Sequence, residues 1–529
     1  MFRIGILVLI SSILLGCQSS KKYNEKLNSL KSPEQLRSDI DYVHTNLSKY
    51  HPQLYKYISK KDLDFKFDSL KSAIDRPLNS REFYLKLSPV VSSIKQGHTA
   101  LYLTTKKNKI KSKPPHNYSP YTAFRVEMID EKLYVIKDNR KDSLVKSGTE
   151  ILSINGVNPL DLFNKYKNTL SSDGDNKTYA VRAFNHRYFS DLYTEKTSND
   201  SLICRLKYKD SIWVADLKEP LRKTTKKPDS LNRDRKIVKK VKSQPAIKKA
   251  KPAKIEGKTL KFLEPDSSVA LITIRNFMQG NFRAFYSRSF KSIKHANTKY
   301  LIIDLRDNGG GRLSDATSLY SYLLDTAFRM TSEFELTSRV SISKTLPAVI
   351  PRIPLYPKPV LKAMATLFAL PISMYVNLHT RKHGNSYLYS TKYSNLVRPQ
   401  KDNFKGKVYV LINGGTFSAS TIVSANLKGT NRALFVGEET GGAFNGCVAG
   451  LLPILDLPKS KLNLRFGIFH IQPDHLSKVE GRGIFPDQEI KISLSDRLKK
   501  IDAELSWVLR DIKRKNDSQT RISQETLQE

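Results

Sequence analysis

The sequence predicts an α/β protein in which a helical region and a β-rich region precede the main core. From residue 259 onward, short β-branched runs alternate with stretches of helical period, as in a largely parallel sheet covered by helices. The 529 residues are enough for several domains, and an apolar content of 39% excludes a collagen-like, coiled-coil or wholly disordered chain. The formal net charge of +40 favours anionic partners but does not define a fold.

Residues 1–16 are predicted to be a lipoprotein signal peptide. Residues 4–15 form an apolar run that is too short to span a bilayer, and the run ends in the letters LLGC. This ending resembles a bacterial lipobox, so we expect Cys17 to be acylated and residues 17–29 to form a tether. An ordinary secretory signal with a chance cysteine is the alternative. Acyl chains hold a protein on a membrane without a spanning helix.

A lipobox places the protein in the bacterial cell envelope, and we expect it at the outer membrane, facing the periplasm. With Cys17 acylated, Cys204 and Cys447 remain. They form either one disulfide or two buried thiols, and three cysteines are too few for a disulfide scaffold.

Residues 30–116 are predicted to form an N-terminal helical region. Ser32 and Asn79 are each followed three residues later by Gln35 or Glu82, the pattern of a capping box at a helix start. Apolar residues then recur at helical spacing, until the second helix stops near Gly97.

Residues 117–221 change to the period of strands, most clearly at 133–136 and 202–206. The segment 148–157 resembles the end of a PDZ domain, in which a buried strand leads into an Asn-Gly turn. PDZ domains bind peptide termini by adding a strand to a sheet edge. A plain hairpin with an Asn-Gly turn is the alternative.

Residues 222–258 are predicted to be a basic linker, with 15 Lys and Arg against 3 Asp and Glu. It is either a solvated loop or a segment that lies against anionic lipid. We do not expect nucleic acid as a partner, because no nucleic-acid module accompanies the charge.

The core is predicted over residues 259–345 and 401–512, followed by a polar tail at 513–529. Residues 346–400 interrupt it as an insertion. Within the insertion, the apolar stretch 361–376 is too short and broken to span a bilayer. A lid, the wall of a ligand pocket and a membrane-dipping segment all stay open as interpretations.

Two motifs follow predicted core strands. The strand 408–412 runs into NGGTFSAS, which places Ser418 at a strand–turn–helix junction. Backbone N–H groups at a helix start stabilise negative charge, so Ser418 is either a nucleophile or a helix cap. The strand 301–305 leads to the glycines at 309–311, whose backbone can approach a ligand closely. No Walker lysine follows them.

Four segments together resemble the C-terminal processing (tail-specific) serine protease family. They are DLRDNGGG, TFSAS, VGEETGG and GIFPD, in that order, and they cover residues 268–490. With the PDZ-like segment, the resemblance reaches back to about residue 80. It implies a protease core of the tail-specific/crotonase-like type and hydrolysis of peptide bonds by a serine.

One departure from the family pattern concerns the general base. The lysine of the family's Ser–Lys dyad falls at Ala443 in this chain, and alanine cannot accept a proton. The related tricorn-like branch uses a histidine ahead of the core, and the segment QGHTA places His98 there. Its glutamate corresponds to Glu480. The resemblance is therefore nearer to the Ser-His branch, although the serine beside that histidine is replaced here by Gly97.

The resemblance implies a mechanism in which Ser418 attacks a peptide carbonyl. His98 would accept the serine proton and pass it to the leaving amine, and Glu480 would orient His98. Glu438 and Glu439 are the fallback candidates for that orienting group.

The oxyanion is expected to bind the backbone N–H of Ala419 together with that of Gly310 or Gly311. Asp304 and Asn308 are expected to hold the glycine loop rather than to contact substrate. No cofactor and no metal is expected, since no metal-binding histidine pattern is present.

We therefore expect a membrane-anchored serine endopeptidase whose partners are a polypeptide substrate and a membrane. The alternatives are a non-catalytic peptide-binding scaffold and an apolar-ligand binder on the same fold. The sequence leaves the substrate, the cleavage preference and the oligomeric state undefined.

Overall fold

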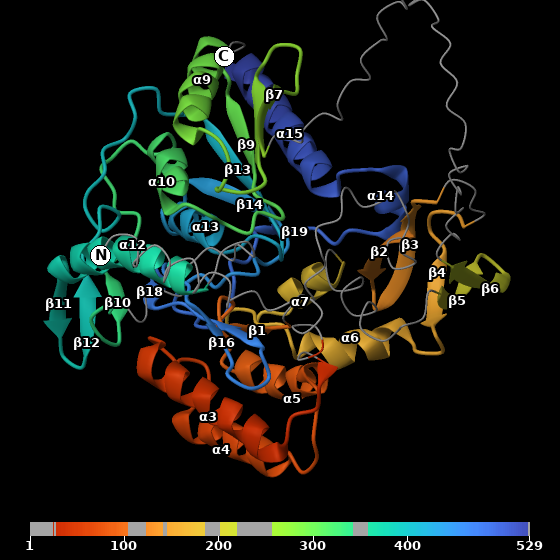
Figure 1. Cartoon of the computed structure of the whole chain (residues 1–529). Helices are drawn as coiled ribbons and strands as arrows, with labels where there is room; N and C mark the ends of the chain where they lie inside the picture. Colours follow the sequence, from red (N-terminus) through yellow and green to blue (C-terminus); the bar gives the residue numbers. More distant parts are fainter. Residues whose placement is uncertain are drawn as a thin grey trace, which may run out of the picture.

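The computed structural model shows a mixed α/β protein with four sheets, which confirms the predicted fold class (Figure 1). The structure describes residues 25, 28–103, 123–140, 145–185, 201–218, 257–341 and 358–526. The leader, Cys17 and most of the basic linker lie outside the described residues.

The largest sheet forms the core and has the strand order β19-β14-β13-β9-β8-β7. All neighbouring strands in it are parallel except the edge pair β7 and β8. The strands are β7 (Lys258–Phe262), β8 (Val269–Ile274), β9 (Tyr300–Asp304), β13 (Lys407–Ile412), β14 (Ala433–Gly437) and β19 (Gln488–Glu489).

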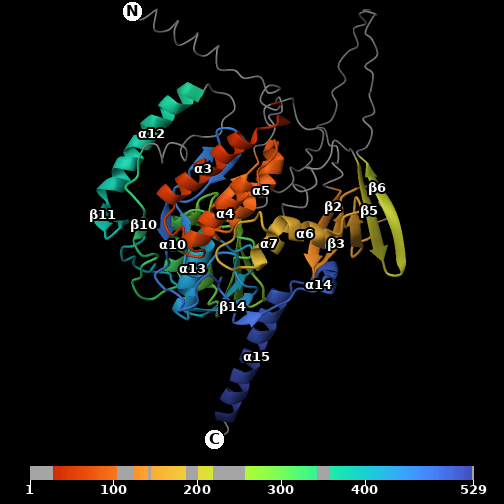
Figure 2. The same ribbon diagram turned by 90° about the horizontal axis from the view of Figure 1, so that it is seen from below.

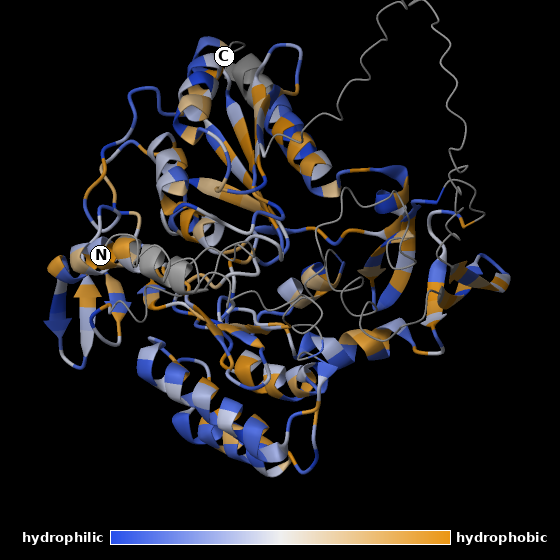
Figure 3. Cartoon of the chain, in the orientation of Figure 1, coloured by the Kyte–Doolittle hydropathy of each residue, from blue (hydrophilic) through white to orange (hydrophobic). Residues whose placement is uncertain are grey.

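Helices cover both faces of this sheet, which explains why its central strands are almost wholly apolar. In β9, Leu301 and Ile303 join the large core cluster on one face, whereas Tyr300 and Ile302 pack toward the C-terminal helix on the other. Figure 3 colours these strands largely hydrophobic. The covering helices are α9 (Phe282–His295), α10 (Leu313–Ser321) and α13 (Ala419–Gly429) on the first face, and α15 (Ala503–Thr526) on the second.

The parallel pairing of β9 with β13 determines where the site forms. Leu411 lies opposite Asp304 in this pair, so the two strands end at the same edge of the sheet. The glycine loop after β9 and the turn before α13 therefore meet, as ligand-binding loops do at the carboxyl edge of a parallel sheet.

In its described part the N-terminal region contains three helices, and two of them begin where the sequence predicts. Capping boxes are present at Ser32 and Asn79. The buried Asp39 accepts the backbone N–H groups of Lys459 and Ser460 at 3.0 and 2.6 Å, which joins this region to the core. The helices are α3 (Pro33–Tyr50), α4 (Lys60–Ser72) and α5 (Ser80–Ser92).

A small sheet brings the residues after α5 to the core. The strand β1 (Ala100–Tyr102) pairs with β17 (Asn463–Arg465), which in turn pairs with β16 (Ile454–Asp456). In this register Ala100 lies opposite Arg465, so the segment that carries His98 runs alongside a strand of the protease core.

The β-rich region is a five-stranded antiparallel sheet with its own hydrophobic cluster. Asn155 and Gly156 have φ of 49° and 79°, as a tight Asn-Gly turn requires, but the chain then enters α6 instead of returning as a paired strand. The PDZ-like interpretation stays a prediction. The elements are β2 (Phe124–Ile129), β3 (Lys132–Asp138), β4 (Glu150–Ile154), β5 (Ser201–Tyr208), β6 (Ser211–Lys218), α6 (Pro159–Lys167) and α7 (Thr178–Ala183).

The described part of the insertion joins core strands in a further sheet, of order β11-β12-β10-β18-β15. Within the described residues, no helix combines the length and apolar character needed to cross a membrane. Cys204 and Cys447 are two buried free thiols, not a disulfide. The elements are β10 (Phe334–Leu336), α12 (Lys358–Leu378), β11 (Thr380–His383), β12 (Ser386–Tyr389), β15 (Cys447–Ala449) and β18 (Phe469–Ile471), and α14 (Leu494–Lys499) precedes α15.

Candidate active site

Ser418 occupies the N-cap position, directly before the first residue of α13, in a backbone conformation that few residues adopt. Its φ of 57° and ψ of −128° lie outside the favoured regions for an L-amino acid. Its side chain makes no capping hydrogen bond to the helix. The helix-cap interpretation is therefore not supported, and the strained turn is typical of residues that are held for chemistry.

Glycines surround Ser418 because the backbone passes too close for side chains. A Cβ built on Gly310, which has a φ of 92°, would lie 2.6 Å from the Ser418 Cβ. A Cβ on Gly442 would lie 2.4 Å from the hydroxyl of Thr421 and 3.3 Å from the Ser418 nitrogen. The glycine loop and the segment after β14 thus both contact the nucleophile turn.

Asn308 connects the glycine loop to this turn. Its buried side chain donates from Nδ2 to the Ile274 carbonyl at 3.0 Å and accepts the Gly310 N–H at 2.9 Å. Its own carbonyl accepts the N–H of Phe417 at 3.0 Å. Asn308 therefore holds the loop, as the sequence predicts.

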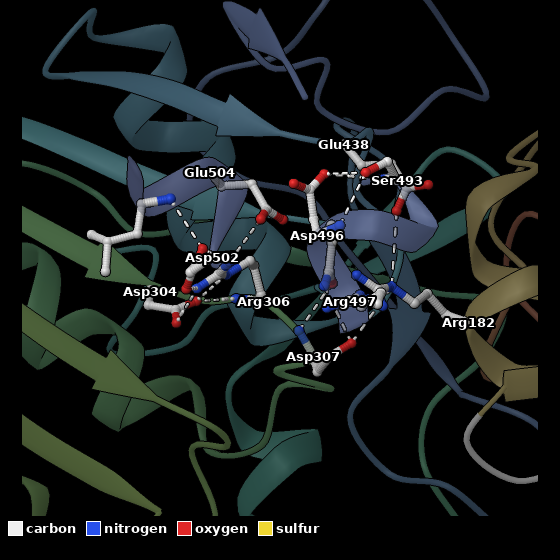
Figure 4. Close-up of polar contacts among 12 residues, drawn as sticks. Arg182, Asp304, Arg306, Asp307, Glu438, Ser493, Asp496, Arg497, Asp502 and Glu504 are labelled. Atoms are coloured by element: carbon white, nitrogen blue, oxygen red, sulfur yellow. Dashed lines mark hydrogen bonds and ion pairs between the residues drawn. The ribbon is translucent and has the colours of Figure 1, made fainter. Parts of the chain in front are cut away.

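Asp304 holds the base of the same loop through ion pairs. Its buried carboxylate accepts hydrogen bonds from Arg275 and Arg306, each at 2.9 Å. Arg306 also pairs with Asp502 and Glu504 at 2.7 and 3.0 Å (Figure 4). The start of α15 is thereby joined to the end of β9.

The expected oxyanion donors are not equivalent in the structure. The Gly310 N–H is already bonded to Asn308. Within the described residues, the N–H groups of Ala419 and Gly311 have no acceptor. Gly310 lies directly against Ala419, because a Cβ on that glycine would be 3.0 Å from the Ala419 nitrogen. Ala419 and Gly311 are therefore the pair available for an oxyanion.

His98 lies against the residue that precedes Ser418. Its ring packs on Phe417, with the ring centres 5.5 Å apart. Gly97 permits this contact, since a Cβ there would lie 2.2 Å from the Phe417 ring. The structure thus brings together two segments that are far apart in the sequence, although no hydrogen bond joins His98 to Ser418 in the part of the chain that is described.

The surroundings of His98 favour the neutral imidazole. Burial and then the Arg465 guanidinium lower the pKa of His98 to about 4. The same arginine donates to the His98 carbonyl at 3.3 Å. The ring nitrogen Nδ1 is buried and has no hydrogen-bond partner. A neutral histidine can accept a proton at physiological pH.

Glu480 does not contact His98 among the described residues. Its side chain, 58% exposed, accepts from the Asn445 amide at 2.9 Å and pairs with Lys56 at 3.2 Å. The fallback carboxylates are also bonded elsewhere. Glu439 binds the Arg482 guanidinium and the Gly483 N–H, and Glu438, whose pKa burial raises, accepts the N–H of Gly414 at 3.2 Å.

Asp173 is a candidate site residue that the sequence analysis missed. Its buried carboxylate accepts the Gly97 N–H at 2.6 Å and the Ala443 N–H at 3.4 Å. It therefore joins the His98 segment to the position where the family's dyad lysine falls. Burial raises the pKa of Asp173 to about 7, against the opposing effect of the two N–H donors. The polar segment SSDGD around it reads as an ordinary turn, so the sequence carried no signal.

A cavity of about 470 Å³ lies beside these groups. Gly97, Gly309 and Gly415 form its floor, and Tyr179, Arg182 and Arg465 contribute larger side chains. A polar cavity of about 640 Å³ shares Arg182 and borders the cluster of Figure 4. The two cavities thus offer polar and apolar surface next to the site.

The comparisons with known proteins concern the family and the fold of the chain. The model of peptidase family S41 matches residues 268–490. The solved structure of mature CPAF complexed with lactacystin superposes with a TM-score of 0.60 at 15% identity, covering 91% of this chain and 98% of that one. Mature CPAF gives a TM-score of 0.58 at 15% identity, with 90% and 96% covered.

The photosystem II D1 C-terminal processing protease also matches, with a TM-score of 0.35 at 12% identity, covering 89% of this chain and 98% of that one. No match was found among curated proteins.

We predict that Asp173→Asn slows reaction at Ser418 by about 10- to 100-fold, because an amide nitrogen would face one of the two N–H donors and displace the His98 segment. The rate of labelling by a fluorophosphonate measures this. The matched control is Asp175→Asn, because Asp175 is exposed and pairs only with Lys95 among the described residues. Equal rates for the two variants would contradict a positioning role.

We also predict that Asp173→Asn changes how the stability of the protein depends on pH. The pKa of Asp173 is raised from 3.8 to about 7, so its protonated form stabilises the folded state. This contribution to the free energy of unfolding is complete below pH 3.8 and is lost as the pH rises through about 7. Denaturant titrations between pH 4 and 8 should show this dependence in the wild type and in Asp175→Asn but not in Asp173→Asn.

Proposed function

Because the chain belongs to peptidase family S41 through residues 268–490 and is a serine-type peptidase, we propose that it is a membrane-anchored endopeptidase of the cell envelope. Its substrates would be envelope proteins or peptides, with Ser418 as nucleophile and His98 as general base. One observation carries the proposal. Ser418 has a strained backbone, makes no capping hydrogen bond and lies beside backbone N–H groups that have no acceptor among the described residues. The residue before it, Phe417, packs against the ring of the neutral His98.

In the proposed reaction, His98 accepts the proton of the Ser418 hydroxyl as the serine oxygen attacks the peptide carbonyl carbon. The N–H groups of Ala419 and Gly311 stabilise the resulting oxyanion. His98 then protonates the leaving amine, and a water molecule, deprotonated by His98, hydrolyses the acyl-enzyme. The histidine ring must move onto the serine hydroxyl for the first transfer.

We propose that Glu480 orients His98 in the working enzyme, as the resemblance implies. In the structure Glu480 forms an ion pair with Lys56, and the glutamate side chain is largely exposed. Exposed ion pairs contribute little to the free energy of folding, so the carboxylate can exchange Lys56 for His98. Asp173 would position the backbone of the same segment through Gly97.

The lipid anchor at Cys17 and the outer-membrane, periplasm-facing location are part of the proposal and rest on the lipobox-like leader. The PDZ-like sheet would present peptides to the site. Its β6 is an edge strand, which supports binding by strand addition.

The apolar-ligand alternative has one observation in its favour. A groove of about 470 Å³ between α12 and the neighbouring sheet is lined almost wholly by carbon atoms, including those of Phe334, Val376 and Phe469. This alternative, and the non-catalytic scaffold, would take the lead if Ser418 proved unreactive.

We predict that a fluorophosphonate probe labels the folded wild type, that Ser418→Ala abolishes labelling, and that His98→Ala slows it by about 100-fold or more. Gel fluorescence after timed labelling measures this, with His379→Ala as a control for loss of an exposed histidine. Labelling that survives His98→Ala would assign the base elsewhere. A folded wild type that is not labelled would contradict the enzyme proposal.

The pH dependence of labelling should reveal the lowered pKa of His98. Because burial and Arg465 lower the pKa of His98 to about 4, its neutral form persists in acid, and the rate should fall only as the pH drops through about 4. Arg465→Gln should move this limb to higher pH. Tryptophan fluorescence at each pH would separate this loss of labelling rate from acid unfolding. A labelling rate that falls already near pH 6.5 would contradict a lowered pKa of His98.

A further inference from the structure

The described side chains of α12 include many that are apolar and exposed. Among the described side chains between Leu367 and Leu378, those of Ala369, Ser373 and Val376 are buried, and their spacing defines one narrow stripe. Leu367, Met374 and Leu378 are 75%, 57% and 80% exposed, and Leu370, Ile372 and Tyr375 are exposed as well. A helix that is apolar beyond its buried stripe is typical of one that contacts another apolar phase.

The apolar groove continues from this exposed face. Ile372 and Tyr375 belong to both, and Tyr389 and Leu451 extend the groove onto the sheet side. Figure 3 shows the described end of α12 as largely hydrophobic. Helix and groove thus form one apolar surface, which we name the α12 face.

The sequence segment that contains α12 carries formal charge of a single sign. Residues 336–401 contain ten Lys and Arg and no Asp or Glu. Arg381 and Lys382 are exposed in β11, which follows directly after the helix, and Arg381 pairs with Glu333. Cations next to exposed leucines are complementary to a lipid bilayer, which has an apolar interior and, at its surface, anionic headgroups.

We propose that the α12 face lies in the headgroup region of an anionic membrane, with its leucines and Met374 among the upper acyl chains and its cations on lipid phosphates. The helix would lie in the plane of the membrane rather than cross it, since it is not apolar enough to span one. This contact goes beyond the proposed protease activity and does not depend on Ser418.

A second copy of the chain is a poorer occupant of the same face. Residues 336–401 have a formal charge of +10 and contain no carboxylate, so two copies that met through this segment would pair like charges. Like charges at an interface oppose association, whereas anionic lipid is complementary.

The contact would orient the protein on its membrane. Both views place α12 and the β5–β6 pair on opposite sides of the molecule (Figures 1 and 2). Ile212 and Val214 on β6 are 51% and 63% exposed, so this pair provides a matched apolar surface that the proposal leaves in water.

The test uses the full chain, as cells produce it, reconstituted on vesicles of phosphatidylcholine with and without phosphatidylglycerol. An environment-sensitive NBD dye is attached at Met374→Cys or, as the control, at Ile212→Cys; the remaining thiols, Cys204 and Cys447, are buried. The proposal predicts that the dye at position 374 emits at shorter wavelength on anionic vesicles and is quenched by brominated acyl chains, while the dye at 212 does neither.

A second variant keeps the test independent of the dye position. Leu367→Glu with Leu378→Glu should abolish the quenching at position 374, whereas Val214→Glu should leave it unchanged. All three substitutions affect exposed side chains, so we expect both variants to fold.

The proposal is overturned if the dye at 374 stays as accessible to water as the dye at 212. It is also overturned if the blue shift occurs without quenching by brominated lipid and grows with protein density, because that result would assign the face to a second copy.

Discussion

The backbone around Ser418 depends on the side chain of Asn308. This buried side-chain amide bonds to the end of β8 and to the glycine loop, and the backbone carbonyl of Asn308 accepts the N–H of Phe417. Two strands that lie next to each other in the sheet but about a hundred residues apart in the chain are thereby fixed at their carboxyl ends. A buried amide with a lost partner costs roughly 1–3 kcal/mol, which is why such a network specifies one arrangement.

The contacts of Asn308 also affect the proposed general base, His98, and the proposed oxyanion donors. Because Phe417 is held from one side by Asn308, its ring offers a fixed surface on which His98 packs. Because the Gly310 N–H is bonded to Asn308, Ala419 and Gly311 remain as the proposed oxyanion donors. The loop is therefore organised before any substrate arrives, as electrostatic stabilisation of an oxyanion requires.

Local patterns in the sequence predicted most of the architecture. The strands at 269–274, 300–305 and 408–412, the capping boxes at Ser32 and Asn79, and the family motifs all depend on neighbouring residues, so one sequence reveals them. The family assignment and the serine-type peptidase activity are confirmed by the match to residues 268–490.

The sequence could not show contacts that form between distant segments. Asp173 lies in a polar turn and gains its burial only when the His98 segment and Ala443 close over it. In the same way, the sequence assigned Glu480 to His98, whereas its observed partners, Lys56 and Asn445, come from opposite parts of the chain. The Ser-His mechanism and the lipid anchor stay predictions, since the described residues contain no His98–Ser418 bond and do not include Cys17.

The site around Ser418 is expected to hydrolyse peptide bonds. The most direct measurement is to incubate the purified chain with an unfolded polypeptide mixture and to identify new peptide ends by mass spectrometry, with Ser418→Ala as the reference. The wild type should produce internal cleavages that are absent with the variant. A folded wild type that produces no new ends beyond those of Ser418→Ala would contradict this expectation.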